Sequence, residues 1–233
     1  MIIALNNKSN LNKVEYLTYQ EKLKNVKANS ELILCPTFLN INLFDLNNFR
    51  LGSQNVSSEK CGAHTGEISA EDLKNSNVEY AIVGHSERRQ SQKESLEEIN
   101  QKIKRLFENN ITPILCIGET REERENKEFK KVLEKELITA TDALDENQKS
   151  RIIIAYEPIW SIGTGVIPTN EEIIEVFNFI KTILPNNKIL YGGSANEKNI
   201  DTLKLIKEID GYLLGGLSLK PDELQIFINK ILQ

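Results

Sequence analysis

The chain has 233 residues, of which 29 are Lys or Arg and 34 are Asp or Glu, so its formal net charge at pH 7 is −5. It has no basic run and no interleaved aromatic stripe, so we expect no nucleic-acid partner. No apolar run is long enough to span a membrane, and no positively charged segment precedes the apolar start Met1–Leu5. We therefore expect a cytoplasmic protein that does not bind a membrane.

Short apolar runs alternate with amphipathic stretches along the whole chain. This pattern is typical of repeated βα units that place parallel strands in one sheet. The predicted strands are Ile2–Leu5, Leu32–Cys35, Phe49–Ser53, Tyr80–Val83, Pro113–Ile117, Ile152–Tyr156, Lys188–Tyr191 and Gly211–Leu214. No flexible linker or shift in composition divides them, so we expect one domain over residues 1–233.

Predicted helices are clearest in three stretches. Thr169–Leu184 begins with Thr169 and Glu172 at the spacing of a capping box. Lys93–Asn109 carries its apolar residues on one face, as a helix that covers a sheet does. Leu224–Leu232 supplies a final helix.

Eight strands with helical crossovers suit either a closed (β/α)8 barrel or an open doubly wound sheet. A doubly wound nucleotide-binding protein should carry a glycine-rich turn after its first strand, but Asn6-Asn7-Lys8 stands there. The α/β class with a single (β/α)8 barrel is therefore favoured, and its site is expected at the C-terminal ends of the strands. The three cysteines, Cys35, Cys61 and Cys116, are far apart and predict neither a disulfide framework nor a metal site.

Polar residues follow three of the predicted strands directly. Asn6 and Lys8 follow the first, His85 and Glu87 follow the fourth, and Glu157 follows the sixth. In a barrel these positions converge on one mouth. His85 lies where a helix is expected to begin, and a helix N-terminus disfavours the charged imidazolium.

Glycines gather at the same ends of the later strands. The last two strands end in Tyr191-Gly192-Gly193-Ser194 and Leu214-Gly215-Gly216, whose backbone N–H groups could hold an anion. Pro158 fixes the chain exit after Glu157, and Gly163 and Gly165 follow in a loop able to close over a small molecule.

These residues belong to eight motifs. In chain order they are Asn6-x-Lys8, Gly52-x-Gln54-Asn55, Thr65-Gly66-Glu67, Gly84-His85-Ser86-Glu87-Arg88-Arg89, Cys116-Ile117-Gly118-Glu119, Ala155-Tyr156-Glu157-Pro158-x-Trp160, Tyr191-Gly192-Gly193-Ser194 and Gly215-Gly216. With them the chain resembles the triosephosphate isomerase family over essentially its whole length. The resemblance implies a TIM barrel that interconverts dihydroxyacetone phosphate and glyceraldehyde 3-phosphate with neither a metal nor an organic cofactor.

The resemblance also implies roles for the polar residues. Glu157 would be the base that moves a proton between adjacent carbons, and a neutral His85 would polarise the carbonyl and shuttle protons between the two oxygens. Lys8 would stabilise the enediolate and the phosphate charge, Asn6 would orient Lys8 and the substrate, and Glu87 would pair with Lys8.

The phosphate would be bound by N–H groups of four residues, which are Gly163, Ser194, Gly215 and Gly216. Closure of the loop from Pro158 to about Pro168 would exclude water. The family is usually a homodimer in which the loop around Thr65 reaches into the partner and supports Asn6 and Lys8, so we expect a homodimer.

Three positions depart from the family pattern. Asn7 stands where an aromatic residue is usual, which removes apolar packing behind Asn6 and Lys8. His64 replaces the usual Phe in the interface loop, and Pro168 alters the hinge of the lid.

Two alternatives remain at this point. One is another phosphate-binding barrel, such as a phosphosugar aldolase with Lys8 as its Schiff-base lysine, or a phosphoribosyl isomerase. The other is a non-catalytic homologue that serves as a binding or scaffold protein, which loss of Glu157, His85 or Lys8 would have favoured.

Overall fold

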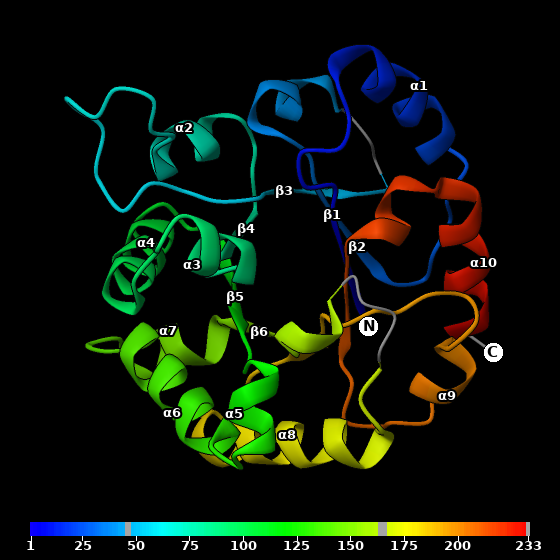
Figure 1. Cartoon of the computed structure of the whole chain (residues 1–233). Coiled ribbons are helices and arrows are strands. Elements are labelled where there is room, and N and C mark those ends of the chain that lie inside the picture. Colours follow the sequence, from blue (N-terminus) through cyan, green and yellow to red (C-terminus); the bar gives the residue numbers. More distant parts are fainter. Residues whose placement is uncertain (45–47, 163–166, 232–233) are drawn as a thin grey trace.

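A computed structural model describes residues 1–44, 48–162 and 167–231 of the chain. Within these residues, eight parallel strands form a closed barrel in the order of the sequence (Figure 1). The last strand pairs with the first, so that Gly211 lies opposite Ile2. The predicted closed (β/α)8 barrel is therefore confirmed, and the open sheet is excluded.

The strands agree with the predicted ones to within one residue at each end. They are β1 (Ile2–Asn6), β2 (Glu31–Cys35), β3 (Arg50–Ser53), β4 (Tyr80–Val83), β5 (Thr112–Ile117), β6 (Ile153–Tyr156), β7 (Ile189–Tyr191) and β8 (Gly211–Leu214). Their agreement reflects the short β-branched and apolar runs that parallel strands, buried on both faces, require.

Helices surround the barrel in Figure 1. They are α1 (Lys13–Leu23), α2 (Ala70–Asn75), α3 (Ser86–Ser91), α4 (Leu96–Glu108), α5 (Arg121–Glu125), α6 (Phe129–Ala140), α7 (Glu146–Arg151), α8 (Asn170–Ile183), α9 (Ile200–Leu203) and α10 (Pro221–Ile231). In the described residues three 3₁₀ turns follow β2, β6 and β8, which are η1 (Phe38–Leu43), η2 (Ile159–Ser161) and η3 (Gly216–Leu219). The described part of the chain has no helix long and apolar enough to cross a membrane.

The helix ends follow their capping residues. The capping box of Thr169 and Glu172 is present at the start of α8, as predicted. Helix α4 begins three residues later than predicted, because Ser95 caps it by accepting the N–H of Glu98. Helix α10 begins three residues earlier, at Pro221, since proline is well suited to the first helical position.

Side chains alternate between the inside and the outside of the barrel. Ile2 and Ala4 of β1 belong to the cluster inside, whereas Ile3 and Leu5 belong to the larger cluster between sheet and helices. A strand has a period of two, so the next residues continue this alternation. Asn6 is thereby directed inward.

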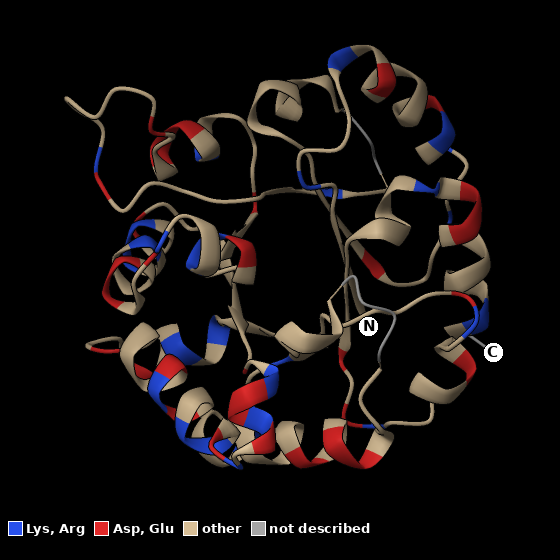
Figure 2. Ribbon diagram, in the orientation of Figure 1, with Lys and Arg blue, Asp and Glu red and all other residues tan. Residues whose placement is uncertain are grey.

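Charged residues of both signs are mixed over the helices that surround the barrel (Figure 2). The strands themselves are almost free of charge in this view, which fits their burial in the two apolar clusters. A functional carboxylate inside the barrel therefore lies in apolar surroundings and needs specific partners to remain ionised.

Candidate active site

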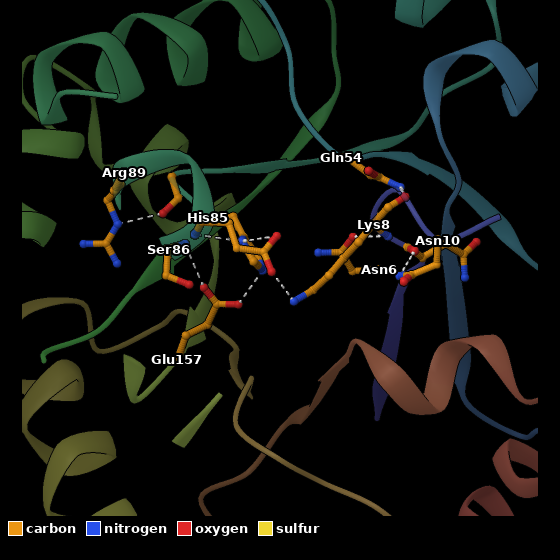
Figure 3. A network of polar contacts seen from close by, with 11 residues as sticks. Asn6, Lys8, Asn10, Gln54, His85, Ser86, Arg89 and Glu157 are labelled. Atoms are coloured by element: carbon orange, nitrogen blue, oxygen red, sulfur yellow. Dashed lines mark hydrogen bonds and ion pairs between the residues drawn. The ribbon is translucent and has the colours of Figure 1, made fainter. Parts of the chain in front are cut away.

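A cavity of about 360 Å³ opens at the C-terminal ends of the strands. Seven of the predicted catalytic and substrate-binding residues line it, which are Asn6, Lys8, His85, Glu157, Ser194, Gly215 and Gly216. Glu87 contacts the group through Lys8, and Gly163 lies outside the described residues. Figure 3 shows that the side chains of Lys8, His85 and Glu157 converge although they come from three distant segments.

Glu157 reaches the cavity because it continues the alternation of β6. Ile153 and Ala155 point into the barrel, and Glu157 is the next residue in this series. Its side chain is 3% exposed and lies beside Gly192, where an added Cβ would be 2.8 Å from Cγ of Glu157. Glycine at the end of β7 therefore leaves the space that this carboxylate occupies.

Two donors hold the carboxylate of Glu157. Its Oε1 lies 3.1 Å from Nε2 of His85, and its Oε2 accepts the N–H of Ser86 at 3.3 Å. Burial raises the pKa of Glu157, but the charge and hydrogen bond of His85, together with the Ser86 N–H, lower it by more. The net pKa is below its ordinary value, so Glu157 is ionised at neutral pH and can accept a proton.

His85 points into the cavity because the backbone turns sharply just before it. Gly84 has a φ of 69°, a conformation in which glycine is far less strained than other residues, and this turn breaks the alternation of β4. Nδ1 of His85 accepts the N–H of Glu87 at 3.3 Å. This hydrogen bond requires an unprotonated Nδ1, which leaves Nε2 to carry the proton toward Glu157.

The pKa of His85 reflects two opposing effects. Burial lowers it, but the carboxylate of Glu157 and its hydrogen bond raise it by more, so the net pKa is raised. The family resemblance implied a neutral imidazole. The accepting Nδ1 is consistent with that state, whereas the direct contact with Glu157 favours the charged one.

Lys8 follows β1 in a left-handed backbone conformation, with a φ of 51°. Oδ1 of Asn6 accepts its backbone N–H at 3.0 Å, and Gln54 donates to its backbone carbonyl at 2.8 Å. The ammonium lies 2.6 Å from Oε1 of Glu87. Both the backbone and the charged end of Lys8 are thus held, with the ammonium directed into the cavity.

The glycine-rich side of the cavity is formed by the ends of β7 and β8. Ser194 donates its hydroxyl to the carbonyl of Ser161 at 2.8 Å, which joins the β7 end to the turn η2 after Glu157. Gly216 begins η3, and Ser218 closes this turn by donating its N–H to the carbonyl of Gly215 at 2.9 Å. Backbone N–H groups at such turns suit an anionic ligand.

The start of the predicted lid is anchored by a buried carboxylate. Glu119 accepts hydrogen bonds from the Tyr156 hydroxyl at 3.0 Å and from Nε1 of Trp160 at 3.1 Å. Burial raises the pKa of Glu119, and these two donors lower it in part. The middle of the predicted lid lies outside the described residues, whereas Pro168 at its far end is buried before α8.

Sequence reasoning gave no role to three residues that support this site. Gln54 holds the Lys8 backbone and Ser86 holds Glu157, as described above. Arg89 donates to the carbonyl of Gly84 at 2.9 Å and pairs with the buried Glu136. The sequence could have indicated Gln54, Ser86 and Arg89 in one way, because all three lie within the motifs shared with the family.

Glu136 is a buried carboxylate that connects the C-terminal ends of β4 and β5. It accepts the N–H of Gly118 at 2.8 Å in addition to its pairing with Arg89. Burial raises the pKa of Glu136 to about 7 although Arg89 and the Gly118 N–H act in the opposite direction. No motif contains Glu136, so only the three-dimensional structure connects it to the site.

Asn7 shows how the structure accommodates a departure from the family pattern. The side chain is fully buried, and its amide nitrogen contacts the Tyr19 hydroxyl and the Ser218 hydroxyl. The amide nitrogen of this buried side chain is therefore satisfied by hydrogen bonds.

Comparison with known proteins agrees with the geometry. The family model described as triosephosphate isomerase matches residues 1–231. A triosephosphate isomerase of Mycoplasmopsis pulmonis is 43% identical, over 84% of this chain and 81% of that protein. Triosephosphate isomerases of Clostridium botulinum and Alkaliphilus oremlandii are each 38% identical, over 98% of both chains. The chain therefore belongs to the triosephosphate isomerase family.

Proposed function

We propose that Glu157, His85 and Lys8 carry out the reaction of this protein, the interconversion of dihydroxyacetone phosphate and D-glyceraldehyde 3-phosphate. Glu157 removes a proton from the carbon next to the carbonyl and returns it to the neighbouring carbon. The observation that supports this role most directly is a buried carboxylate with a lowered pKa, aimed into the cavity beside His85. The reaction belongs to glycolysis and gluconeogenesis, and we propose a cytoplasmic location.

His85 provides the proton for the oxygen atoms. Its Nε2 carries a proton when Nδ1 accepts the Glu87 N–H, so Nε2–H can donate to a substrate carbonyl. In the structure this proton points to Glu157. A bound substrate would replace that direct contact and lie between acid and base, which would also remove the main cause of the raised His85 pKa.

Lys8 supplies positive charge where negative charge develops. An ammonium fixed beside the cavity stabilises the enediolate more than the uncharged carbonyl from which it forms. Asn6 holds the Lys8 backbone and Glu87 directs the ammonium. With these groups the reaction needs no metal or organic cofactor, so activity should be unchanged after treatment with a chelator.

The glycine-rich side is proposed to bind the phosphate. Ser194, Gly215 and Gly216 line the cavity, and we assign their N–H groups to the phosphate. The fourth residue of the proposed set, Gly163, lies outside the described residues. Closure of the segment from Pro158 to about Pro168 would exclude water and protect the enediolate. A net charge of −5 does not prevent binding of a dianion, because local dipoles and Lys8 determine the field in the cavity.

The first experiment measures isomerisation of glyceraldehyde 3-phosphate in a coupled assay, with Glu157→Gln as the variant. This change removes the base and nearly preserves the shape, so kcat should fall by roughly three decades or more, as expected when a general base is lost. Asn187→Gln, at a buried asparagine bonded to the carbonyls of Lys149 and Ile152, serves as the control for folding effects. Activity of Glu157→Gln within tenfold of the wild type would contradict the assignment.

We also propose a homodimer formed through the loop around Thr65. Residues 59–67 between β3 and α2 are all exposed and extend away from the barrel (Figure 1). Strand β2 pairs with β3, and the 3₁₀ turn η1 follows β2. Leu39 in η1 is 95% exposed. An exposed projecting loop and an exposed large apolar side chain are features that a partner chain could cover.

Sedimentation can test this dimer. Thr65→Arg should convert the dimer to a monomer, whereas Asn126→Arg, an exposed residue at the end of α5, should leave it unchanged. The side chain of His64 is 41% exposed in the single chain and would be covered in the dimer, so placing a carboxylate there with His64→Glu should also weaken association. An unchanged sedimentation profile for His64→Glu would exclude burial of His64.

We further propose that residues 1–233 form one domain. Closure of the barrel requires β1 and β8 to pair, so the two ends of the chain depend on each other. A single thermal transition, seen equally by circular dichroism and tryptophan fluorescence, is the expected result.

A further inference from the structure

Asn7 lies on the outer side of β1, facing away from the cavity. Ile3 and Leu5 belong to the cluster between sheet and helices, and Asn7 continues this series. Its exposed fraction is 0%, and its backbone N–H donates to the carbonyl of Cys35 at 3.2 Å. Asn7 therefore touches no substrate, although it lies between Asn6 and Lys8.

A closed set of hydrogen bonds surrounds the Asn7 amide. Its Nδ2 donates to the Tyr19 hydroxyl at 3.2 Å and to the Ser218 hydroxyl at 3.1 Å. The Tyr19 hydroxyl donates to the backbone carbonyl of Ser218 at 2.6 Å. The Ser218 hydroxyl donates to the backbone carbonyl of Asn6 at 3.1 Å. We call these three side chains the Asn7 ring.

The hydrogen atoms fix the orientation of the amide. Both hydroxyl protons are used on backbone carbonyls, so the Tyr19 and Ser218 oxygens can only accept from Asn7. Oδ1 of Asn7 has no hydrogen-bond partner among the described residues. A rotated amide would place Oδ1 against two oxygens without available protons, so the observed orientation is the one that satisfies the ring.

The ring joins the two sides of the cavity from behind. Through the Asn6 carbonyl it holds the end of β1, and through Ser218 it holds η3, which begins at Gly216. The two sides are close, because a Cβ added at Gly215 would lie 3.4 Å from Cε of Lys8. Tyr19 ties both to α1.

Lys8 depends on support of this kind. Its φ of 51° is a conformation that residues other than glycine adopt at a cost in energy, so surrounding contacts must maintain it. Gln54 holds the carbonyl side of Lys8, and Asn6 holds its N–H. The Asn7 ring holds the backbone of Asn6 itself.

We propose that Asn7 is a positioning residue, which acts with Tyr19 and Ser218 to fix Lys8 relative to the turn at Gly215 and Gly216. This inference rests on the proposed function, in which Lys8 stabilises the enediolate while that turn binds the phosphate. The ring keeps the ammonium at the separation from the phosphate site that one bound triose phosphate requires. Small displacements of a catalytic group have large effects on rate.

Tyr19→Phe is the sharpest single change, because it removes one hydroxyl and retains the ring system. Tyr16→Phe is its matched control: Tyr16 is equally buried on α1, and its hydroxyl accepts the N–H of Thr37 without contacting Asn7 or Ser218. We expect Tyr19→Phe to lower kcat/KM about tenfold at 25 °C and Tyr16→Phe less than twofold, with similar losses in Tm. Ser218→Ala provides a second test if Tyr19→Phe does not fold.

To distinguish an effect through Lys8 from a merely structural role of the Asn7 ring, the Tyr19→Phe and Tyr16→Phe changes are repeated in the Lys8→Met variant. If the ring acts through Lys8, Tyr19→Phe should change kcat/KM by less than twofold in that background. A tenfold effect in both backgrounds, or an effect equal to that of Tyr16→Phe, would overturn the inference while leaving the proposed function intact. A folded wild-type protein without isomerase activity would instead refute the proposed function.

Discussion

Glu157 and Lys8 reach the same cavity by different structural means. Glu157 continues the inward alternation of β6, and its carboxylate is held by His85 and Ser86 at the start of α3. Lys8 lies past the end of β1 in a left-handed conformation and is held by residues of other loops and helices. Strand geometry thus directs the base into the cavity before any tertiary contact holds its carboxylate, whereas even the backbone conformation of the cation depends on tertiary contacts.

Among the tests of this difference between Glu157 and Lys8, we expect the largest loss of kcat when a new side-chain atom crowds Glu157. In Gly192→Ala the added Cβ would lie 2.8 Å from Cγ of Glu157, so the carboxylate must move. We expect kcat to fall by about 100-fold, the scale of a misplaced catalytic group, with little change in KM.

Gly52→Ala provides the control for this crowding. Its Cβ would lie 2.5 Å from Sγ of Cys35, inside the same barrel but away from Glu157. It should lower Tm while kcat stays within about threefold. If both variants lose kcat equally, the rate depends on barrel packing in general rather than on the position of Glu157.

We expect a smaller loss of kcat/KM when the ion pair of Lys8 is removed. Glu87→Gln removes the ion pair of Lys8 but retains the backbone N–H that Nδ1 of His85 accepts. The Glu87 side chain is 56% exposed, and exposed pairs contribute about 0.2–1 kcal/mol, so kcat/KM should fall by about fivefold at most. Steady-state kinetics at two salt concentrations would check this, since the wild-type advantage should shrink as salt rises.

The smallest expected effect is a pH dependence of stability. The raised pKa of His85 contributes stability that is full below its unfolded value and is lost as pH rises through the folded value. The lowered pKa of Glu157 contributes stability above its unfolded value, which is lost only as pH falls through the folded value. Their pairing is therefore most stabilising in mildly acidic solution.

Calorimetry without substrate can measure how much the pairing of His85 with Glu157 stabilises the protein at each pH. The difference in Tm between the wild type and His85→Gln should be more favourable to the wild type at pH 5.5 than at pH 8.5. A difference that is constant, or that grows toward pH 8.5, would show that His85 is not stabilised in its charged form by Glu157.

Much of the fold could be predicted because local patterns carried it. The strands were predicted to within one residue, since parallel strands buried on both faces require short apolar runs. The capping box of Thr169 and Glu172 marked the start of α8 for an equally local reason. Seven residues that line the cavity were predicted as well, because each lies at the end of a predicted strand or within a few positions after it.

The remaining contacts depend on residues far apart in the chain. From the sequence, Asn7 was predicted to remove packing behind Lys8. Its hydrogen-bond partner Ser218 is 211 positions away, so no local pattern could indicate that contact. Glu136 joins the site only through Arg89 and Gly118. Closure of the barrel brings these groups together, and no local pattern records which ones will meet.

The sequence by itself therefore determined the architecture, the family and the chemical groups available at the cavity. Only the tertiary structure decided how those groups are held, with His85 against Glu157, Lys8 against Glu87, and Asn7 within its ring. The physical reason is that the period of a strand is local, whereas a buried polar group is satisfied by whichever partner the closed barrel places beside it.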